Sequence, residues 1–271
     1  MDLTTLARAK QYLAGIPSFT GADALYAQMI TAASGAACQF CSRTFQRTTY
    51  NVARLNGSGT ERQALPNNPV ISVSSLVIDG YTYLPSPDAI ATGYQYDNKF
   101  LYLFGGPIFK MGLRNVAVGF TAGYSTMETD FIPAAGPYTI TPVTGAGVDS
   151  QGYPSATAGP AMVDRGVTFV SNGAALTLVT GVPTAGQYAF AAGVYTFAAA
   201  DSAKQVTMSY DYVPANVEQA VINMVGTWIK QRDNLGIASK SLANENISYR
   251  DQGLTAAAKQ LLQPYRWVLM P

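Results

Sequence analysis

The chain has 271 residues, of which 48% are hydrophobic and only 12% are charged, and its formal net charge is +1. A chain of this length can bury a substantial core, but it contains no histidine, which removes the commonest general base, the usual catalytic triads and the commonest metal ligand. Since an ordinary globular protein carries about 25% charged residues, the low charge favours burial against partners and a structural protein over an enzyme.

The charged side chains are spread unevenly along the chain. Residues 121–212 hold two basic and six acidic side chains, whereas both ends are mildly basic. No basic cluster marks a nucleic-acid surface, so we expect any contact with DNA to be weak and passing. No apolar run approaches the ~20 residues of a membrane span, and the start Met1-Asp2-Leu3 lacks the basic region of a signal peptide. We therefore predict no membrane contact.

Two helices are predicted near the N-terminus. Residues 3–14 form the first, which Asp2 or Thr4 can cap. Residues 22–42 form the second, because apolar side chains recur there at spacings of three and four. Its alanine-rich centre, residues 32–37, is slim enough for another backbone to come close, in the same subunit or in the next one.

The second helix contains both cysteines, Cys38 and Cys41. A redox pair needs this spacing at the start of a helix that follows a strand, and a zinc site needs two more ligands. Neither context is present in the sequence. We interpret both as small residues packed within the helix, and predict no metal or cofactor.

Short strands separated by turn signals follow from Thr48 onward. Their spacing of about ten residues favours an antiparallel sheet or a small barrel. The Gly57-Ser58-Gly59 loop lacks the Lys-Ser/Thr and the helix of a phosphate-binding loop, so we interpret it as a hairpin turn. The predicted strands are residues 48–55, 69–78, 81–84, 94–96, 100–104 and 115–124.

The middle of the chain is interpreted as an insertion. Residues 125–165 are rich in Gly, Pro, Ala, Thr and Ser without periodicity, and are predicted to be mainly loop. Residues 166–212 alternate again and predict about five strands. The strands at 115–124 and 205–212 both end in an aromatic residue, but only the second leads into a helix. We therefore place an insertion at roughly 125–204, between the last strand of a core domain and its closing helix.

The closing part is predicted as two helices around a polar loop. Residues 214–232 form a helix with Pro214 in its first turn, where the missing N–H costs nothing. A loop as long as 233–253 in a compact domain usually binds something or is disordered, and a second helix follows at 255–262. The tail to Pro271 is aromatic and apolar, so it should dock into a groove, on a partner or on its own domain.

The predicted fold class is α+β. A helical core domain, in which the N-terminal helices pack with a C-terminal helix, is joined to a small antiparallel β-sheet and carries an inserted β-rich module. The core domain comprises residues 1–124 and 213–271. The inserted loop and β-sandwich-like module comprise residues 125–212.

Several motifs occur in a characteristic order. They are Leu6-Ala7-Arg8-Ala9-Lys10-Gln11-Tyr12-Leu13, Ala22-Asp23-Ala24-Leu25, Ala32-Ala33-Ser34, Asn68-Pro69-Val70-Ile71-Ser72-Val73, Asp79-Gly80, Gly119-Phe120-Thr121-Ala122-Gly123-Tyr124, Val213-Pro214 with Val217-Glu218-Gln219-Ala220, and Leu262 with Pro264-Tyr265-Arg266. Together they resemble the head–tail connector (adaptor) proteins of tailed bacteriophages. The resemblance covers residues 1–124 and 213–271, about two thirds of the chain. The insertion departs from that pattern, and its segment 193–201 looks like β modules of other phage structural proteins.

The resemblance implies a virion structural protein in the neck between head and tail, assembled in the host cytoplasm. It implies a ring, commonly of twelve subunits, that sits below the portal, continues the DNA channel and receives a tail or nozzle protein. Passing contact with double-stranded DNA follows from that position. The residues expected to contact the portal are Pro264, Tyr265, Arg266, Trp267 and Val268. The loop residues expected to lie between subunits or on a partner are Arg232, Lys240, Asn244, Tyr249 and Arg250.

Two alternatives use the insertion. In the first, a tail or receptor-binding β protein stacks glycans on Tyr153, Tyr188 and Tyr195, although strand tyrosines more often pack in a core. In the second, a glycosidase uses two carboxylates. Its candidate acids, Asp149, Asp164, Asp201 and Asp211, mostly sit at predicted turns, where Asp is expected anyway.

Overall fold

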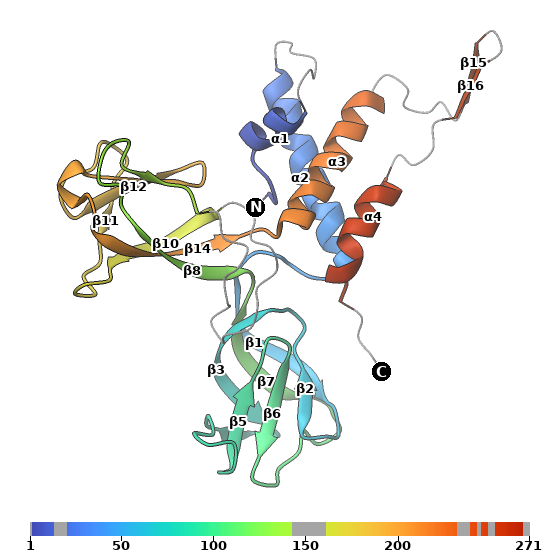
Figure 1. Ribbon diagram of the computed structural model, residues 1–271. Coiled ribbons are helices and arrows are strands. Elements are labelled where there is room, and N and C mark those ends of the chain that lie inside the picture. The colour runs from blue at the N-terminus through green and yellow to red at the C-terminus, as the bar shows by residue number, and fades with distance from the viewer. Residues whose placement is uncertain are drawn as a thin grey trace. The chain divides into compact units, whose positions relative to one another are not determined.

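The computed structural model describes residues 2–13, 21–142, 161–231, 239–242, 245–248 and 253–267 (Figure 1). Its internal contacts divide the chain into two units. The helical unit combines Met1–Arg43 with Val213–Pro271, and the β unit comprises Thr44–Tyr212. The predicted α+β fold class is confirmed, including the packing of N-terminal helices with a C-terminal helix.

The helical unit joins elements from both ends of the chain. Helix α2 contacts α3, which contacts α4, and α1 contacts α2 (Figure 1). A two-stranded hairpin, β15 with β16, precedes α4. The elements are α1 (Leu6–Tyr12), α2 (Ala22–Cys41), α3 (Ala215–Gln231), β15 (Ser239–Leu242), β16 (Glu245–Ser248) and α4 (Ala256–Leu262). The hairpin corrects the prediction that residues 233–253 are wholly loop.

The helices begin and end where local chemistry dictates. Thr5 caps α1, because its hydroxyl accepts a hydrogen bond from the Arg8 N–H. The cap is therefore neither of the two predicted residues, Asp2 and Thr4. The Thr4 hydroxyl instead donates a hydrogen bond to a carboxylate of α3. The carbonyl of Pro214 accepts the first hydrogen bonds of α3, so this proline lies immediately before the helix. Helix α2 ends at Ser42, which adopts the left-handed conformation.

A buried carboxylate connects the two ends of the chain. Glu218, in the first turn of α3, is only 3% exposed. It accepts hydrogen bonds from Arg8 Nε at 2.6 Å, Arg8 Nη2 at 2.8 Å and Thr4 Oγ1 at 2.9 Å. The bonds to Glu218 raise the pKa of the Arg8 guanidinium. Both charges are thus satisfied by a bidentate pair.

Apolar stripes complete the packing of the helical unit. In α3 the apolar residues at spacings of three and four are fully buried at Val217, Val221, Met224 and Val225, whereas Trp228 on the same stripe is half-buried. The core positions of α2 recur at spacings of three and four, as an amphipathic helix requires. They are Tyr26, Ile30, Ala33, Ala37 and Cys41.

The described residues of the β unit form four sheets. The first two hold strands from residues 48–122, and the other two hold strands from residues 125–212. In sheet order, the first is β1 (Thr48–Gly57), β7 (Gly112–Ala122), β3 (Val70–Ile78) and β4 (Tyr81–Tyr83), and the second is β2 (Arg62–Ala64), β6 (Phe100–Phe104) and β5 (Gly93–Tyr96). The third is β10 (Ala161–Phe169), β14 (Gln205–Tyr212) and β8 (Ser125–Phe131), and the fourth is β11 (Thr177–Leu178), β12 (Gln187–Ala191), β13 (Val194–Phe197) and β9 (Thr139–Ile140).

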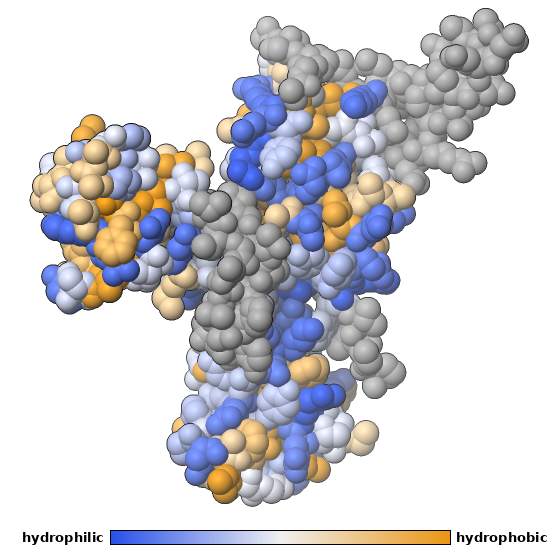
Figure 2. Space-filling model, viewed as in Figure 1, coloured by the Kyte–Doolittle hydropathy of each residue, from blue (hydrophilic) through white to orange (hydrophobic). Residues whose placement is uncertain are grey.

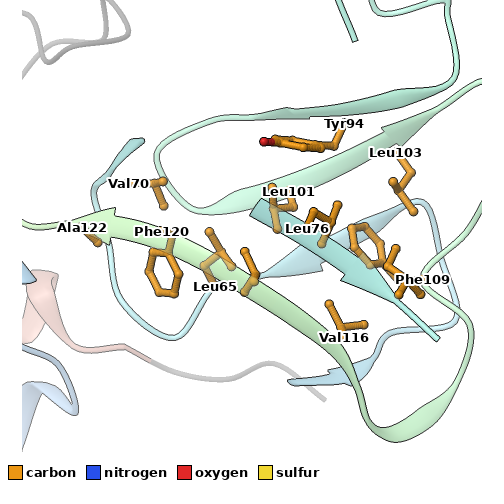
Figure 3. Packing of buried hydrophobic residues seen from close by; sticks show 12 residues of the cluster. Leu65, Val70, Leu76, Tyr94, Leu101, Leu103, Phe109, Val116, Phe120 and Ala122 are labelled. Atoms are coloured by element: carbon orange, nitrogen blue, oxygen red, sulfur yellow. The ribbon is translucent and has the colours of Figure 1, made fainter. Parts of the chain in front are cut away.

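One apolar cluster holds the first two sheets together (Figure 3). Alternate residues of β7 point into it, including Val116, Val118 and Phe120, as strand periodicity requires. Leu101 and Leu103 enter from β6 of the second sheet. Close chain passages demand glycine at the edges of this core: a Cβ at Gly57 would lie 1.8 Å from the Lys110 carbonyl oxygen.

Three strands, β8, the two-residue β9 and part of β10, lie where the sequence predicts mainly loop. All of β8 and β9 and the first half of β10 fall within 125–165, so that prediction is wrong for these residues. The β8 sequence mixes Met, Glu, Thr and Asp, which gives little hydrophobic alternation, yet the strand pairs residue by residue with β14. Tertiary pairing overrides the weak local preference. Residues 143–160 lie outside the described residues.

The domain boundary at residue 124 remains a prediction. Strand pairing changes partners there, because β7 ends at Ala122 and β8 begins at Ser125. The contacts nevertheless group residues 44–212 into one unit.

We predict that Arg8→Ala destabilises the helical unit by about 2–3 kcal/mol. This is slightly below the range for a broken buried ion pair, because the Arg8 side chain is 31% exposed. The two tryptophans of the chain, Trp228 and Trp267, both lie in this unit, so urea unfolding followed by tryptophan fluorescence reports on it. Lys10→Ala is the matched control, since Lys10 pairs with a largely exposed Asp23 and should cost under ~1 kcal/mol. Equal losses in the two variants would contradict the role of Glu218.

Candidate functional site

The predicted portal segment continues from α4 and is tied to the end of α2. After α4, residues Gln263–Tyr265 form a single 3-10 turn. The backbone N–H of Trp267 donates to the Cys41 carbonyl at 2.8 Å. The Arg266 guanidinium lies 5.7 Å from the centre of the Phe40 ring, within the range of a cation–π contact. These two contacts fix the root of the tail on the helical unit.

The structure places four of the five predicted portal residues in one short segment. Pro264 and Arg266 are exposed, while Tyr265 and Trp267 are half-buried. Val268 lies outside the described residues. The Pro264 and Arg266 side chains are therefore the exposed part of this segment. A portal contact by these residues remains a prediction.

The second predicted set falls in and around the hairpin. Lys240 belongs to β15. Arg232, Asn244, Tyr249 and Arg250 lie outside the described residues. What the structure adds is the backbone: Lys240 pairs with Ile247 across the two strands.

The two cysteines occupy α2 as the sequence predicts, and neither forms a disulfide. Cys41 is buried, and its thiol faces the Leu262 carbonyl at 3.7 Å. Burial raises the pKa of the Cys41 thiol to about 11, which disfavours the reactive thiolate. Among the described residues, no group of three or more His, Cys, Asp or Glu side chains could hold a metal ion. Nor is any helix among them long and apolar enough to cross a membrane.

The tyrosines proposed to stack glycans are core residues. Tyr188 and Tyr195 are 2% and 0% exposed. Their hydroxyls donate to the Asp164 carboxylate at 2.6 and 3.0 Å. Burial, together with this negative carboxylate, raises the pKa of both phenols. The glycan hypothesis is wrong for these two side chains, and Tyr153 lies outside the described residues.

The candidate catalytic acids also have structural partners. Asp201 is 1% exposed and accepts from the Gly186 N–H and from Lys204 Nζ, both at 2.7 Å. Asp211 pairs with the Arg165 guanidinium. Asp164 is held by the two tyrosines. These contacts occupy the carboxylates in turns and strand pairs, rather than placing two of them across a cleft. Asp149 lies outside the described residues.

One end of the first two sheets exposes apolar side chains that the sequence analysis did not single out (Figure 2). They lie in turns and at strand ends near two hydrogen-bonded sites: Asn115 bonds the Gly57 N–H and Asp79, and the Asp88 carboxylate accepts from two backbone N–H groups. In the sequence, these residues could have been recognised as apolar side chains within or beside glycine-containing turns. They are Tyr81, Leu84, Ile90, Met111 and Leu113, each more than 70% exposed.

Comparisons with known proteins assign no family: no family model and no curated protein matches this sequence. Similar solved structures include a chain from the neck of an empty gene transfer agent particle with C6 symmetry (TM-score 0.44, 13% identity, 99% of this chain and 92% of that chain). A chain from the virion of the native particle gives a TM-score of 0.38 at 13% identity, with the same coverage. A chain from the native neck with C12 symmetry gives 0.36 at 12% identity, covering 100% and 96%. Likeness of this degree fixes neither fold nor function.

We predict that thiol reagents label Cys38 but not Cys41 in the native protein at pH 8. Cys38 is half-exposed, whereas a pKa of about 11 leaves about one Cys41 thiolate in a thousand. Labelling both cysteines after unfolding is the control. Mass spectrometry of the labelled peptides gives the result, and rapid native labelling of Cys41 would contradict the packing of the tail root on α2.

We also predict that Tyr195→Phe destabilises the β unit by about 1–2 kcal/mol, because Asp164 loses one buried hydrogen bond. Tyr81→Phe, at an exposed strand tyrosine of the same unit, should change stability by less than ~0.5 kcal/mol. Hydrogen exchange of the β12 and β13 amides measures both effects. If the two variants behaved alike, the Asp164 network would not be structural.

Proposed function

We propose that the protein is a virion neck protein: a head-to-tail adaptor that forms a ring below the portal. In this role it extends the DNA channel and provides the docking surface for a tail or nozzle protein. The ordered motifs of residues 1–124 and 213–271 support the assignment through their resemblance to the connector family. A ring of twelve subunits, located in the neck and assembled in the host cytoplasm, follows from the same resemblance.

The observation that carries the proposal is the C-terminal segment. Its root is fixed by the bond from the Trp267 N–H to Cys41, while Pro264 and Arg266 are exposed. Aromatic and arginine side chains dominate the energy of protein interfaces, and a pre-positioned root lowers the ordering cost of binding. A terminal segment of this kind suits insertion between subunits of a larger ring.

The charge distribution supports a channel that DNA passes through. The net charge is +1, and several cations are already paired: Arg8 with Glu218, Lys10 with Asp23, Arg165 with Asp211, and Lys204 with Asp201. Each phosphate that a protein neutralises increases its affinity for DNA. A chain with almost no excess positive charge permits passing contact with DNA without retention.

The exposed apolar loops of the first two sheets suit the docking of a tail protein. The Ile90 N–H bonds Asp88, and bonds at Lys110 and Arg114 flank Met111 and Leu113, so the backbone here is ordered before any partner binds. Exposed apolar groups on ordered loops favour protein contacts. The alternative, a tail or receptor-binding β protein, loses the two buried tyrosines on which it relied.

Deleting residues 264–271 should abolish binding to the portal while the subunit stays folded, since the deletion begins after α4. Co-sedimentation with assembled portal measures binding, and circular dichroism measures folding. As point variants, Arg266→Ala should weaken binding at least tenfold, an effect of ~1.4 kcal/mol or more. Lys259→Ala, an exposed cation on α4, should leave binding unchanged. A truncated protein that still joins the portal would overturn the contact assignment.

A further inference from the structure

The edge strand β8 presents an unpaired backbone. In the antiparallel ladder with β14, the Tyr212 N–H bonds the Tyr124 carbonyl and the Ile132 N–H bonds the Lys204 carbonyl. Since bonded and non-bonded pairs alternate, the even-numbered residues of β8 direct their N–H and C=O groups toward β14. The odd-numbered residues direct theirs to the free side of the sheet. They are Ser125, Met127, Thr129 and Phe131.

Most of these outward groups have no partner among the described residues. The Phe131 N–H is taken by the Asp130 carboxylate at 2.7 Å. The backbone N–H groups of Met127 and Thr129 meet no described acceptor on that side. The side chains of Met127 and Phe131 are 64% and 59% exposed. Apolar residues along an open edge form a template for another strand.

The other long edge strands are protected. The pairing of β1 with β7 is interrupted by two register shifts, and so is the pairing of β10 with β14. Part of the outer side of β10 is also closed, because Val167 and Phe169 bond residues that follow the strand. Such irregularities blunt an edge against further pairing. By contrast, β8 pairs with β14 over its whole length without a shift.

The hairpin of β15 and β16 is not part of a larger sheet among the described strands. Its two strands pair only with each other among the described strands. An isolated two-stranded hairpin is marginally stable in water at best and is stabilised by further strands. The same chain therefore contains an open sheet edge and a hairpin without a sheet.

Charge favours pairing between these two elements over pairing between two β8 edges. Glu128 and Asp130 give β8 a negative charge, so two copies placed side by side would repel. The two hairpin strands hold one basic and one acidic side chain, Lys240 and Glu245, and so carry no net charge. A hairpin strand therefore meets β8 without the repulsion that a second β8 edge would bring.

We propose that the β15–β16 hairpin of one subunit adds to β8 of a neighbouring subunit, extending the third sheet across the subunit boundary. Strand addition of this kind uses main-chain hydrogen bonds for affinity. The two surfaces differ, so each subunit offers a hairpin to one neighbour and an edge to the other. Such a heterologous contact forms a ring when the rotation between neighbouring subunits closes, as the proposed adaptor ring requires. The inference rests on the proposed ring and assigns Lys240 and its surroundings to the subunit interface.

Two variants of the full chain test the contact. One replaces residues 239–248 by a Gly-Ser linker, and the other is Thr129→Pro, which removes an outward N–H while sparing the ladder to β14. Thr82→Pro is the matched control, because the two-residue turn at Asp79-Gly80 makes Ile78 and Tyr81 a bonded pair and leaves the Thr82 N–H on the free side of β4. Circular dichroism checks each fold. If Thr129→Pro unfolds, the hairpin replacement decides.

Native mass spectrometry and hydrogen exchange then give the result. The wild type should form a ring in which the Met127 and Thr129 amides exchange at least tenfold more slowly than in the dilute monomer. Both test variants should lower the ring fraction at least tenfold, and Thr82→Pro should not. Rings that persist in both test variants overturn strand addition and leave the adaptor proposal standing. Amides protected equally in the monomer overturn addition between subunits. A wild type that forms no ring, alone or with portal, overturns the proposed function itself.

Discussion

The carboxylate of Glu218 joins the two ends of the chain, and the helical unit depends on it. Glu218 lies in the first turn of α3, where the helix dipole favours a negative charge. Burial would make this charge costly if Arg8 and Thr4 did not reach it. The pair therefore fixes the register of the N-terminal segment on a helix more than 200 residues later. Helix α2 and the whole of the β unit, Thr44–Tyr212, lie between these partners in the sequence.

Periodicity predicted the elements that bury a continuous apolar face. Helix α3 buries aliphatic side chains at spacings of three and four, and alternate residues of β7 are buried, so there the local pattern and the final burial agree. In α2 the spacing is as predicted, but the apolar residues Leu25, Met29 and Phe40 are only half-buried. The core face of α2 lies one position further along, at Tyr26, Ile30 and Cys41. The turn at Asp79-Gly80 was predictable for a related reason: both residues adopt positive φ, which suits this pair in a short hairpin. Here local chemistry and tertiary packing require the same residues.

The remaining features depend on partners distant in the sequence. Strand β8 has polar alternate residues, and only pairing with β14 makes it a strand. Thr4 and Thr5 are equivalent as caps until Glu218 takes the Thr4 hydroxyl. The aromatic tail of the candidate site was visible in the sequence, but its attachment to Cys41 and Phe40 was not, since a backbone bond and a cation–π contact leave no spacing pattern. The exposed apolar residues were not predicted, because hydrophobic periodicity identifies positions that become buried. It carries no information about apolar side chains that stay exposed.

The junction at Gly123 and Tyr124 explains why the β unit is one unit with two sets of sheets. These two residues alone separate β7 from β8. The Tyr124 N–H bonds the Phe45 carbonyl and its own carbonyl accepts from Tyr212, so the start, middle and end of the unit meet at one point. The Tyr124 ring packs against those of Phe45 and Tyr212. Glycine is required at 123, because φ is +143° and a Cβ would lie 2.4 Å from Arg47 Cα. With its ends held together, a segment as long as 125–212 adds little loop-closure entropy, and it can form its own sheets without disturbing the first two.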